Sequence, residues 1–193
     1  MPKGHVLVAF GANLPVDAGS GAQPPLATLR RALVDLQAGG LELVAASRFY
    51  TTPCFPPGAG PDYVNAAAAF ATDLDAGATL TLLHEVEAKH GRRRLSRWAG
   101  RTLDLDLIAF DDLVLPDADT YRRWRDLPAL AQATTAPGQL ILPHPRLQDR
   151  GFVLVPLADI AAGWRHPVLG QTVAQMLCAL PEGDLAEISP IEA

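Results

Sequence analysis

The chain has 193 residues, of which 49% are hydrophobic and 19% charged, which suits one hydrophobic core and is marginal for two domains. Its formal net charge of −5 at pH 7 argues against general nucleic-acid binding, which favours a basic surface. No apolar run reaches membrane-spanning length, the N-terminus lacks a signal-peptide pattern, and Cys54 and Cys178 are too far apart in sequence for metal-type spacing. We therefore expect a monomeric, cytoplasmic protein with reduced cysteines.

Taken in chain order, the first 110 residues predict strands that alternate with helices. Runs of β-branched, aromatic and aliphatic residues predict strands, and apolar residues at helical spacing predict helices. The expected strands are 5–10, 41–50, 63–74 and 101–110, and the expected helices are 25–37 and 78–90. Segments rich in Gly and Pro, at 14–24 and 51–62, are expected to be loops.

The remainder of the chain has more helix and one irregular segment. Residues 116–139 hold little periodicity and are interpreted as a loop insertion, in which only 127–133 has helical character. Two further helices are expected at 152–161 and 172–180. The order of elements predicts an α+β fold, a ferredoxin-like sandwich with a largely antiparallel central sheet flanked by helices, in one domain over residues 1–193.

Two acidic residues on the strand at 101–110 suggest a metal site. Alternate strand residues share a face, so Asp104 and Asp106 point the same way and the neighbouring leucines point toward a core. Adjacent carboxylates on an apolar strand repel each other unless a cation lies between them, and Mg²⁺ is the usual one. A solvated edge strand is the simpler alternative, but the apolar continuation through Ile108 and Phe110 makes it less favourable.

Positive charge gathers just before this strand. Five arginines lie within ten residues: Arg92, Arg93, Arg94, Arg97 and Arg101. Guanidinium groups bind phosphates, which often accompany a bound magnesium ion. The simpler alternative is a solvated turn, which is what most runs of charged residues form. Within the cluster, Trp98 is suited to stacking on a base or a guanidinium. Glu87, in the preceding helix, is expected either to pair with an arginine or to accept a hydrogen bond from a nucleotide.

Other candidate residues have two readings each. Asn65 lies in a strand, where amides are disfavoured, and is suited either to reading the edge of a heterocycle or to bonding a loop backbone. Tyr63 and Phe152 are core residues by default or ring-stacking residues, and His144 in its loop most simply caps a carbonyl. Neither a P-loop nor a dinucleotide glycine motif is present, so a nucleotide must be held by side chains and metal.

Several segments between Val6 and Leu177 resemble, in the same order, those of the 6-hydroxymethyl-7,8-dihydropterin pyrophosphokinases. The most specific is the stretch from Gly91 to Asp106, which is similar to the family signature G-R-x-R followed by R-W-x-x-R-T-L-D-L-D. The other similar segments are Gly11–Leu14, Ser47–Pro53, Pro61–Ala66, Pro143–Arg146 and Arg150–Leu157.

This resemblance implies an activity and a set of site residues. The family transfers the β,γ-pyrophosphoryl group of ATP to the hydroxymethyl group of the pterin in folate biosynthesis and releases AMP. Asp104 and Asp106 would hold two Mg²⁺ ions, and Arg92 and Arg101 would act on the transferring phosphates. The implied ATP-binding residues are Glu87, Arg94, Trp98, Arg101, His144 and Arg150. The implied pterin-binding residues are Thr52, Pro53, Phe55, Tyr63, Asn65 and Phe152.

Two alternative functions stay open at this point. One is another Mg²⁺-dependent nucleotidyl- or phosphotransferase that uses the same pair of aspartates. The other is a non-catalytic ferredoxin-like module that binds RNA, which the acidic composition disfavours. The arginines of the insertion, Arg122, Arg123 and Arg125, would form a phosphate-facing lid, a partner surface or, most simply, a solvated loop.

Overall fold

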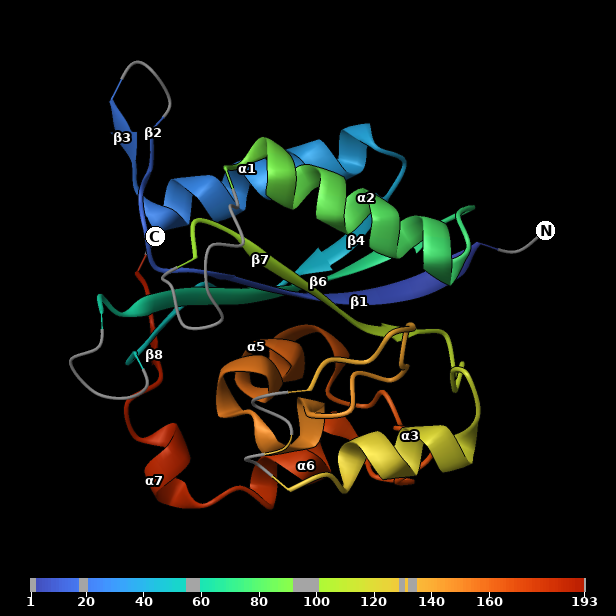
Figure 1. Cartoon of the computed structure of the whole chain (residues 1–193). Coiled ribbons are helices and arrows are strands. Elements are labelled where there is room, and N and C mark those ends of the chain that lie inside the picture. The colour runs from blue at the N-terminus through green and yellow to red at the C-terminus, as the bar shows by residue number, and fades with distance from the viewer. Residues whose placement is uncertain are drawn as a thin grey trace.

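The computed structural model describes residues 3–17, 21–54, 60–91, 101–128, 131 and 135–192. One antiparallel sheet lies between two layers of helices (Figure 1). Helices α1 (Pro25–Ala38) and α2 (Ala76–Lys89) cover one face, and α5 (Gly151–Ala161) lies against the other. The predicted sandwich is therefore confirmed.

The long strands β1 (Gly4–Ala12) and β6 (Tyr63–Thr72) pair with each other in the middle of the sheet. The strand order is β7-β1-β6-β5-β8, and β4 also pairs with β6. The other bounds in this sheet are β4 Glu42–Ala46, β5 Tyr50–Thr52, β7 Asp104–Phe110 and β8 Ser189–Pro190. A separate hairpin consists of β2 (Val16–Asp17) and β3 (Ala22–Gln23).

The second helical layer also contains α3 (Ala118–Arg125) and α6 (Val173–Cys178) (Figure 1). A capping box begins α6. The Thr172 hydroxyl accepts a hydrogen bond from the backbone N–H of Gln175, and the Gln175 side chain accepts one from the backbone N–H of Thr172. The shorter elements are a 3₁₀ turn at Leu147–Asp149 and α7 at Glu182–Leu185. Among the described residues, each helix is too short or too polar to traverse a bilayer.

Two hydrophobic cores lie on opposite faces of the sheet, as a sandwich requires. Val8, Phe10 and Leu105 belong to the core under α1 and α2. Ala67 and Leu154 belong to the core under α5. Strand residues thus alternate between the two cores, which follows from the two-residue period of a strand.

The single strand predicted at 41–50 is wrong, because the structure divides it into β4 and β5. Both segments pair with β6, but the pairing is interrupted at Ser47, whose hydroxyl accepts the amide N–H of Ala67 at 2.8 Å. The amide N–H of Ser47 still donates to the Ala67 carbonyl at 2.9 Å, so a side chain replaces one of the two backbone bonds of this pair. A serine hydroxyl can compete with the backbone for hydrogen bonds, and a pattern of apolar residues does not predict where this happens.

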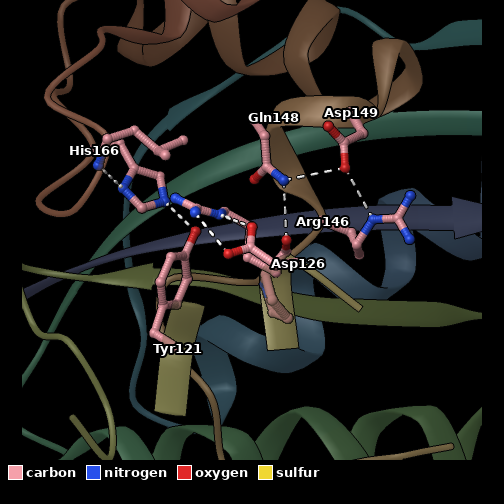
Figure 2. A network of polar contacts seen from close by, with 9 residues as sticks. Tyr121, Asp126, Arg146, Gln148, Asp149 and His166 are labelled. Atoms are coloured by element: carbon pink, nitrogen blue, oxygen red, sulfur yellow. Dashed lines mark hydrogen bonds and ion pairs between the residues drawn. The ribbon is translucent and has the colours of Figure 1, made fainter. Parts of the chain in front are cut away.

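Helix α3 lies inside the segment that was predicted to be an irregular loop. Asp117 caps it, with Oδ1 accepting from the Thr120 amide N–H at 2.8 Å. Tyr121 is fully buried, and its hydroxyl lies 2.7 Å from Nε2 of His166 (Figure 2). Tertiary contact therefore stabilises a short helix that is mostly polar. The helix predicted at 127–133 lies largely outside the described residues.

Candidate functional site

The candidate site lies at one end of the sheet, where β1 runs between β6 and β7. Gly11 pairs with Asn65 on one side and with Asp104 on the other. A β-carbon at Gly11 would lie 3.1 Å from Oδ1 of Asn65, so glycine leaves room for that side chain. A small pocket opens here, and its lining residues are Ala9, Phe10, Gly11, Asn65, Asp104, Asp106, Phe152 and Val153.

The two aspartates share a face of β7, as the strand period predicted. Asp104 and Asp106 are partly exposed, whereas the neighbours on the other face, Leu105 and Leu107, are only 3% and 4% exposed. The apolar side of the strand therefore faces the core under α2, and the acidic side lines the pocket.

Each aspartate lies beside an arginine. The Arg101 guanidinium forms an ion pair with Asp104, and Nη1 of Arg150 lies 3.6 Å from Oδ2 of Asp106. Burial lowers the pKa of Arg150 from its ordinary value. A partly buried guanidinium forms strong bonds to an anion, so these arginines are suited to phosphate as well as to carboxylate.

The donor set at this site fits a magnesium ion that arrives with phosphates. Asp104 and Asp106 present carboxylate oxygens, which Mg²⁺ prefers. Across the described ranges, no group of three or more His, Cys, Asp or Glu side chains is placed to hold a metal. Two carboxylates leave most of an octahedral shell for phosphate oxygens and water, which is how magnesium is usually bound beside nucleotides.

Of the predicted pterin-binding residues, Asn65 and Phe152 line the pocket, and Thr52 pairs with Tyr63 on the neighbouring strand. Asn65 is only 4% exposed, and its Nδ2 donates to Oγ1 of Thr52 at 2.7 Å. Phe152 at the start of α5 is 41% exposed, unusual for a large aromatic side chain. Tyr63 is half-buried, and its burial raises the pKa of its hydroxyl, which therefore stays protonated. Pro53 is exposed in the adjoining segment.

His144 lies on the metal side of the site and is held by backbone contacts. Its amide N–H donates to the carbonyl of Ile108 at 2.8 Å, and its Nδ1 accepts from the amide of Arg146 at 3.2 Å. Burial, together with the charge of Arg150, lowers the pKa of His144 to about 4. The imidazole is therefore neutral at pH 7. Figure 2 shows the adjoining turn, where Asp149 accepts from Arg146 at 3.0 Å and from Gln148 at 3.1 Å.

Glu87 lies beneath the site and has a contact that the sequence did not indicate. Its side chain is 2% exposed, and Oε1 accepts from the amide N–H of Leu105 at 2.8 Å. Leu105 is the residue between the two aspartates, so α2 holds β7 where the acidic side chains project. The predicted contact of Glu87 with the nucleotide stays a prediction.

Four predicted site residues, Phe55, Arg92, Arg94 and Trp98, lie outside the described residues. Of the others, the structure brings Asp104, Asp106, Asn65 and Phe152 to one pocket. Asn13, directly after β1, received no role from the sequence. The sequence signals for it were a polar residue immediately after an apolar strand and its place in the segment Gly11–Leu14, which resembles the family.

Comparisons with known proteins agree with this geometry. Residues 7–162 match the family model described as 7,8-dihydro-6-hydroxymethylpterin-pyrophosphokinase (HPPK). The chain is 36% identical over 163 residues to a 2-amino-4-hydroxy-6-hydroxymethyldihydropteridine pyrophosphokinase of Synechocystis, covering 84% of this chain and 73% of the relative. It is 30% identical over 173 residues to the Haemophilus influenzae protein of the same name, covering 89% and 95%.

The fold is also similar to that of a solved structure, a crystal structure of HPPK-DHPS in complex with substrates. The TM-score is 0.63 at 13% sequence identity, over 93% of this chain and 43% of the other. At this identity the likeness concerns the fold alone.

Proposed function

Because the chain belongs to the 7,8-dihydro-6-hydroxymethylpterin-pyrophosphokinase family, we propose that the site at Asp104 and Asp106 transfers pyrophosphate from ATP to a pterin alcohol. The acceptor is the hydroxymethyl group of 6-hydroxymethyl-7,8-dihydropterin, the second product is AMP, and the reaction serves folate biosynthesis. The observation that supports this most directly is one pocket lined by two carboxylates, an amide and an exposed aromatic ring.

The pterin would bind on the Asn65 side of the pocket. The Asn65 amide donates to Thr52, which leaves the Asn65 oxygen as an acceptor and the Thr52 hydroxyl hydrogen as a donor. A fused heterocycle offers complementary groups along its edge. Phe152 supplies an exposed ring for stacking, with Tyr63 as the second aromatic residue, and Pro53 and Phe55 complete the predicted set.

The triphosphate would bind on the opposite side. Asp104 and Asp106 would hold magnesium, two ions in our proposal, which when bound neutralises phosphate charge and lowers the pKa of the attacking hydroxyl. Arg101 and Arg150 already lie beside these carboxylates and would contact phosphate oxygens. We assign His144, Glu87, Arg92, Arg94 and Trp98 to the same substrate on the strength of the family resemblance.

In this proposal the protein acts by positioning and by charge. Pyrophosphoryl transfer needs the alcohol oxygen in line with the β-phosphorus and needs stabilisation of the charge on the transferring oxygens. Asn65 and Phe152 orient the alcohol, while Arg101 and Arg150 stabilise the phosphates. The neutral imidazole of His144 can donate or accept a hydrogen bond without adding charge.

The test is to incubate the protein with ATP, Mg²⁺ and the hydroxymethyl pterin and to separate the nucleotide products. We expect pterin-dependent AMP, whereas an ordinary phosphotransferase would release ADP. Asp104→Ala and Asp106→Ala should each lower turnover by about 100-fold or more, with folding retained. Asp112→Ala, an exposed aspartate just beyond the other end of β7, is the control and should keep full activity. Robust turnover by both site variants would disprove the metal assignment.

We also propose that the enzyme acts as a monomer in the cytoplasm. ATP as co-substrate and two unpaired thiols, Cys54 and Cys178, suit a reducing compartment. Sedimentation at micromolar concentration tests the oligomeric state, and a mass near 20.5 kDa is expected.

A further inference from the structure

Asn13 lies where the two halves of the proposed site meet. It follows β1 directly and is only 3% exposed. Two residues earlier, Gly11 separates Asn65, on the pterin side, from Asp104, on the metal side. A buried amide at this point must have its hydrogen bonds satisfied, and the groups that satisfy them belong to both sides.

Toward the metal side, Asn13 bonds the backbone of Arg101. Oδ1 of Asn13 accepts from the Arg101 amide N–H at 2.8 Å, and the Asn13 amide N–H donates to the Arg101 carbonyl at 2.9 Å. The amide N–H of Leu14 reaches the same carbonyl at 3.2 Å. These bonds continue the attachment of this segment to β1 beyond the last register pair, Gly11 with Asp104.

Toward the pterin side, Asn13 bonds the segment that enters β6. Nδ2 of Asn13 donates to the carbonyl of Pro61 at 3.0 Å. Tyr63, two residues later, begins β6, and Asn65 lies two residues further along the same strand. One planar amide thus joins the backbone that presents Arg101 to the backbone that presents Tyr63.

We propose that Asn13 is a positioning residue that sets the separation between the phosphate side and the pterin side, an inference that rests on the proposed function. It acts through the backbone of Arg101 and of Pro61. Displacement of either segment would move one substrate relative to the other without destroying the contacts of either. The expected defect is therefore in alignment, which affects turnover more than the binding of a single substrate.

The chemistry of this position requires an asparagine. One amide offers an acceptor and a donor in a fixed plane, and the two bonds use one of each. An aspartate would keep the acceptor for Arg101 but would turn a second oxygen toward the carbonyl of Pro61. An alanine would leave both backbone groups without their partner. Asn13→Asp and Asn13→Ala therefore separate the two bonds.

The first measurement does not depend on the enzyme activity. Amide hydrogen exchange of the substrate-free protein, followed by NMR, reports whether the Arg101 N–H is held. We expect Asn13→Ala to accelerate exchange at Arg101 by about fivefold, since the net value of such a bond is about 1 kcal/mol. Asn13→Asp should leave that exchange slow. Equally slow exchange in Asn13→Ala would overturn the proposal.

The second measurement compares turnover with binding. We expect Asn13→Ala to lower kcat by about 10- to 100-fold. Dissociation constants for a non-hydrolysable ATP analogue and for the pterin, each measured alone, should change by less than about threefold. The kcat of Asn13→Asp should lie between those of Asn13→Ala and the parent protein. If Asn13→Ala does not fold, the comparison is made with Asn13→Asp. A loss of turnover explained wholly by weaker binding of one substrate would overturn the proposal.

The control is a buried hydroxyl far from the site. Thr79 in α2 is fully buried, and its hydroxyl donates to the carbonyl of Asp75 at 2.8 Å. Thr79→Ala removes a comparable bond and should keep full kcat. An equal loss in Thr79→Ala would assign the defect of Asn13→Ala to general destabilisation and refute the positioning role.

Absence of AMP from the parent protein refutes the proposed function, whereas the exchange at Arg101 still decides whether Asn13 holds that segment.

Discussion

At the residue scale, Arg101 competes with a cation for the same carboxylate. Its guanidinium is paired with Asp104, so a metal ion that binds without nucleotide must displace it. We expect Arg101→Ala to strengthen the binding of Mn²⁺ to the nucleotide-free protein by about three- to fivefold, because an ion pair of this exposure is worth up to about 1 kcal/mol. Turnover should fall in the same variant.

Electron paramagnetic resonance of free Mn²⁺ measures this affinity directly. Arg165→Ala, which removes an exposed arginine from the turn between α5 and α6, is the matched control and should leave Mn²⁺ binding unchanged. Weaker binding of Mn²⁺ to Arg101→Ala would show that the guanidinium assists the cation site and does not compete with it.

Phe152 can be tested separately, because a ring that is 41% exposed contributes little to the core. Phe152→Ala should weaken pterin binding by about 10- to 100-fold, the usual range for loss of ring stacking, with little change in thermal stability or in ATP affinity. Calorimetric titration with the pterin checks this. Phe152→Tyr keeps the ring and is expected to bind nearly normally. Unchanged pterin affinity in Phe152→Ala would remove this residue from the proposed site.

His166 gives the protein a pH-dependent stability. Its Nδ1 accepts from the amides of Val168 and Leu169 at 3.1 and 3.2 Å, so its proton lies on Nε2, facing Tyr121. Burial lowers the pKa of His166 from 6.5 to about 4. The unfolded chain therefore binds more protons between these values, and this contribution to stability is full above pH 6.5 and is lost as the pH falls toward 4.

Urea unfolding of the parent protein and of His166→Phe, at a series of pH values from 7.5 to 4, tests this contribution. The shift corresponds to about 3 kcal/mol, and the difference in unfolding free energy between the two proteins should narrow by that order as the pH falls. His144, whose pKa is also about 4, is present in both proteins and cancels from the comparison. A difference that stays constant with pH would contradict the assigned tautomer and burial.

The residues of the site differ in how far the sequence predicted them. The common face of Asp104 and Asp106 followed from the period of a strand and is confirmed. The bond from Glu87 to Leu105 and the bonds from Asn13 to Arg101 join residues that are distant in sequence. Pattern within a segment holds no information about such pairs, because the partner is a backbone group that every residue has.

At the element scale, Asp159 joins α5 to the sheet. Its carboxylate accepts from three groups of Arg48, at 3.1, 3.1 and 2.8 Å, and from the Tyr50 hydroxyl at 2.8 Å. The Arg48 and Tyr50 donors hold the pKa of Asp159 below its usual value, against its burial. This contact sets the distance between α5, which presents Phe152, and β5, which presents Thr52.

We expect Asp159→Ala to lower the free energy of unfolding by about 1–3 kcal/mol, the usual cost of leaving partly buried donors unpaired. Urea denaturation measures it. Asp119→Ala is the control, since that carboxylate is exposed and forms an ion pair with Arg122 on the surface of α3. Equal stability of Asp159→Ala and the parent protein would mean that water replaces the carboxylate without cost.

Elements with strong periodicity were predicted well, and those held by tertiary contacts were not. Helix α1 was expected at 25–37 and is observed at Pro25–Ala38, because its apolar residues repeat at helical spacing and glycines follow it. Helix α3 was missed because it is mostly polar and Tyr121 is its one buried apolar residue. Strand β8 was missed because only two residues pair, and their partner β5 is distant in the chain.

At the scale of the whole molecule, the arginines of α3 serve the helix itself. Arg122 pairs with Asp119 at 2.9 Å, Arg123 donates to Thr120 at 2.8 Å, and Arg125 pairs with Asp126 at 2.7 Å. We expect replacement of Arg122, Arg123 and Arg125 together by serine to leave ATP affinity and oligomeric state unchanged. Calorimetry and sedimentation check the two properties. Weaker ATP binding would support the phosphate-facing lid, and a changed mass in sedimentation would support a partner surface.

The run of alanines in β6 has a consequence for how this enzyme can change. Ala67 is 1% exposed and packs in the core under α5 together with Val153 and Leu154. A larger residue at this position would push α5 away from the sheet, and Phe152 would move with it. A larger residue in β6 is therefore expected to be tolerated mainly when a residue of α5 that packs against it is replaced by a smaller one. Libraries that seek acceptance of a different pterin should vary these core pairs as well as the pocket.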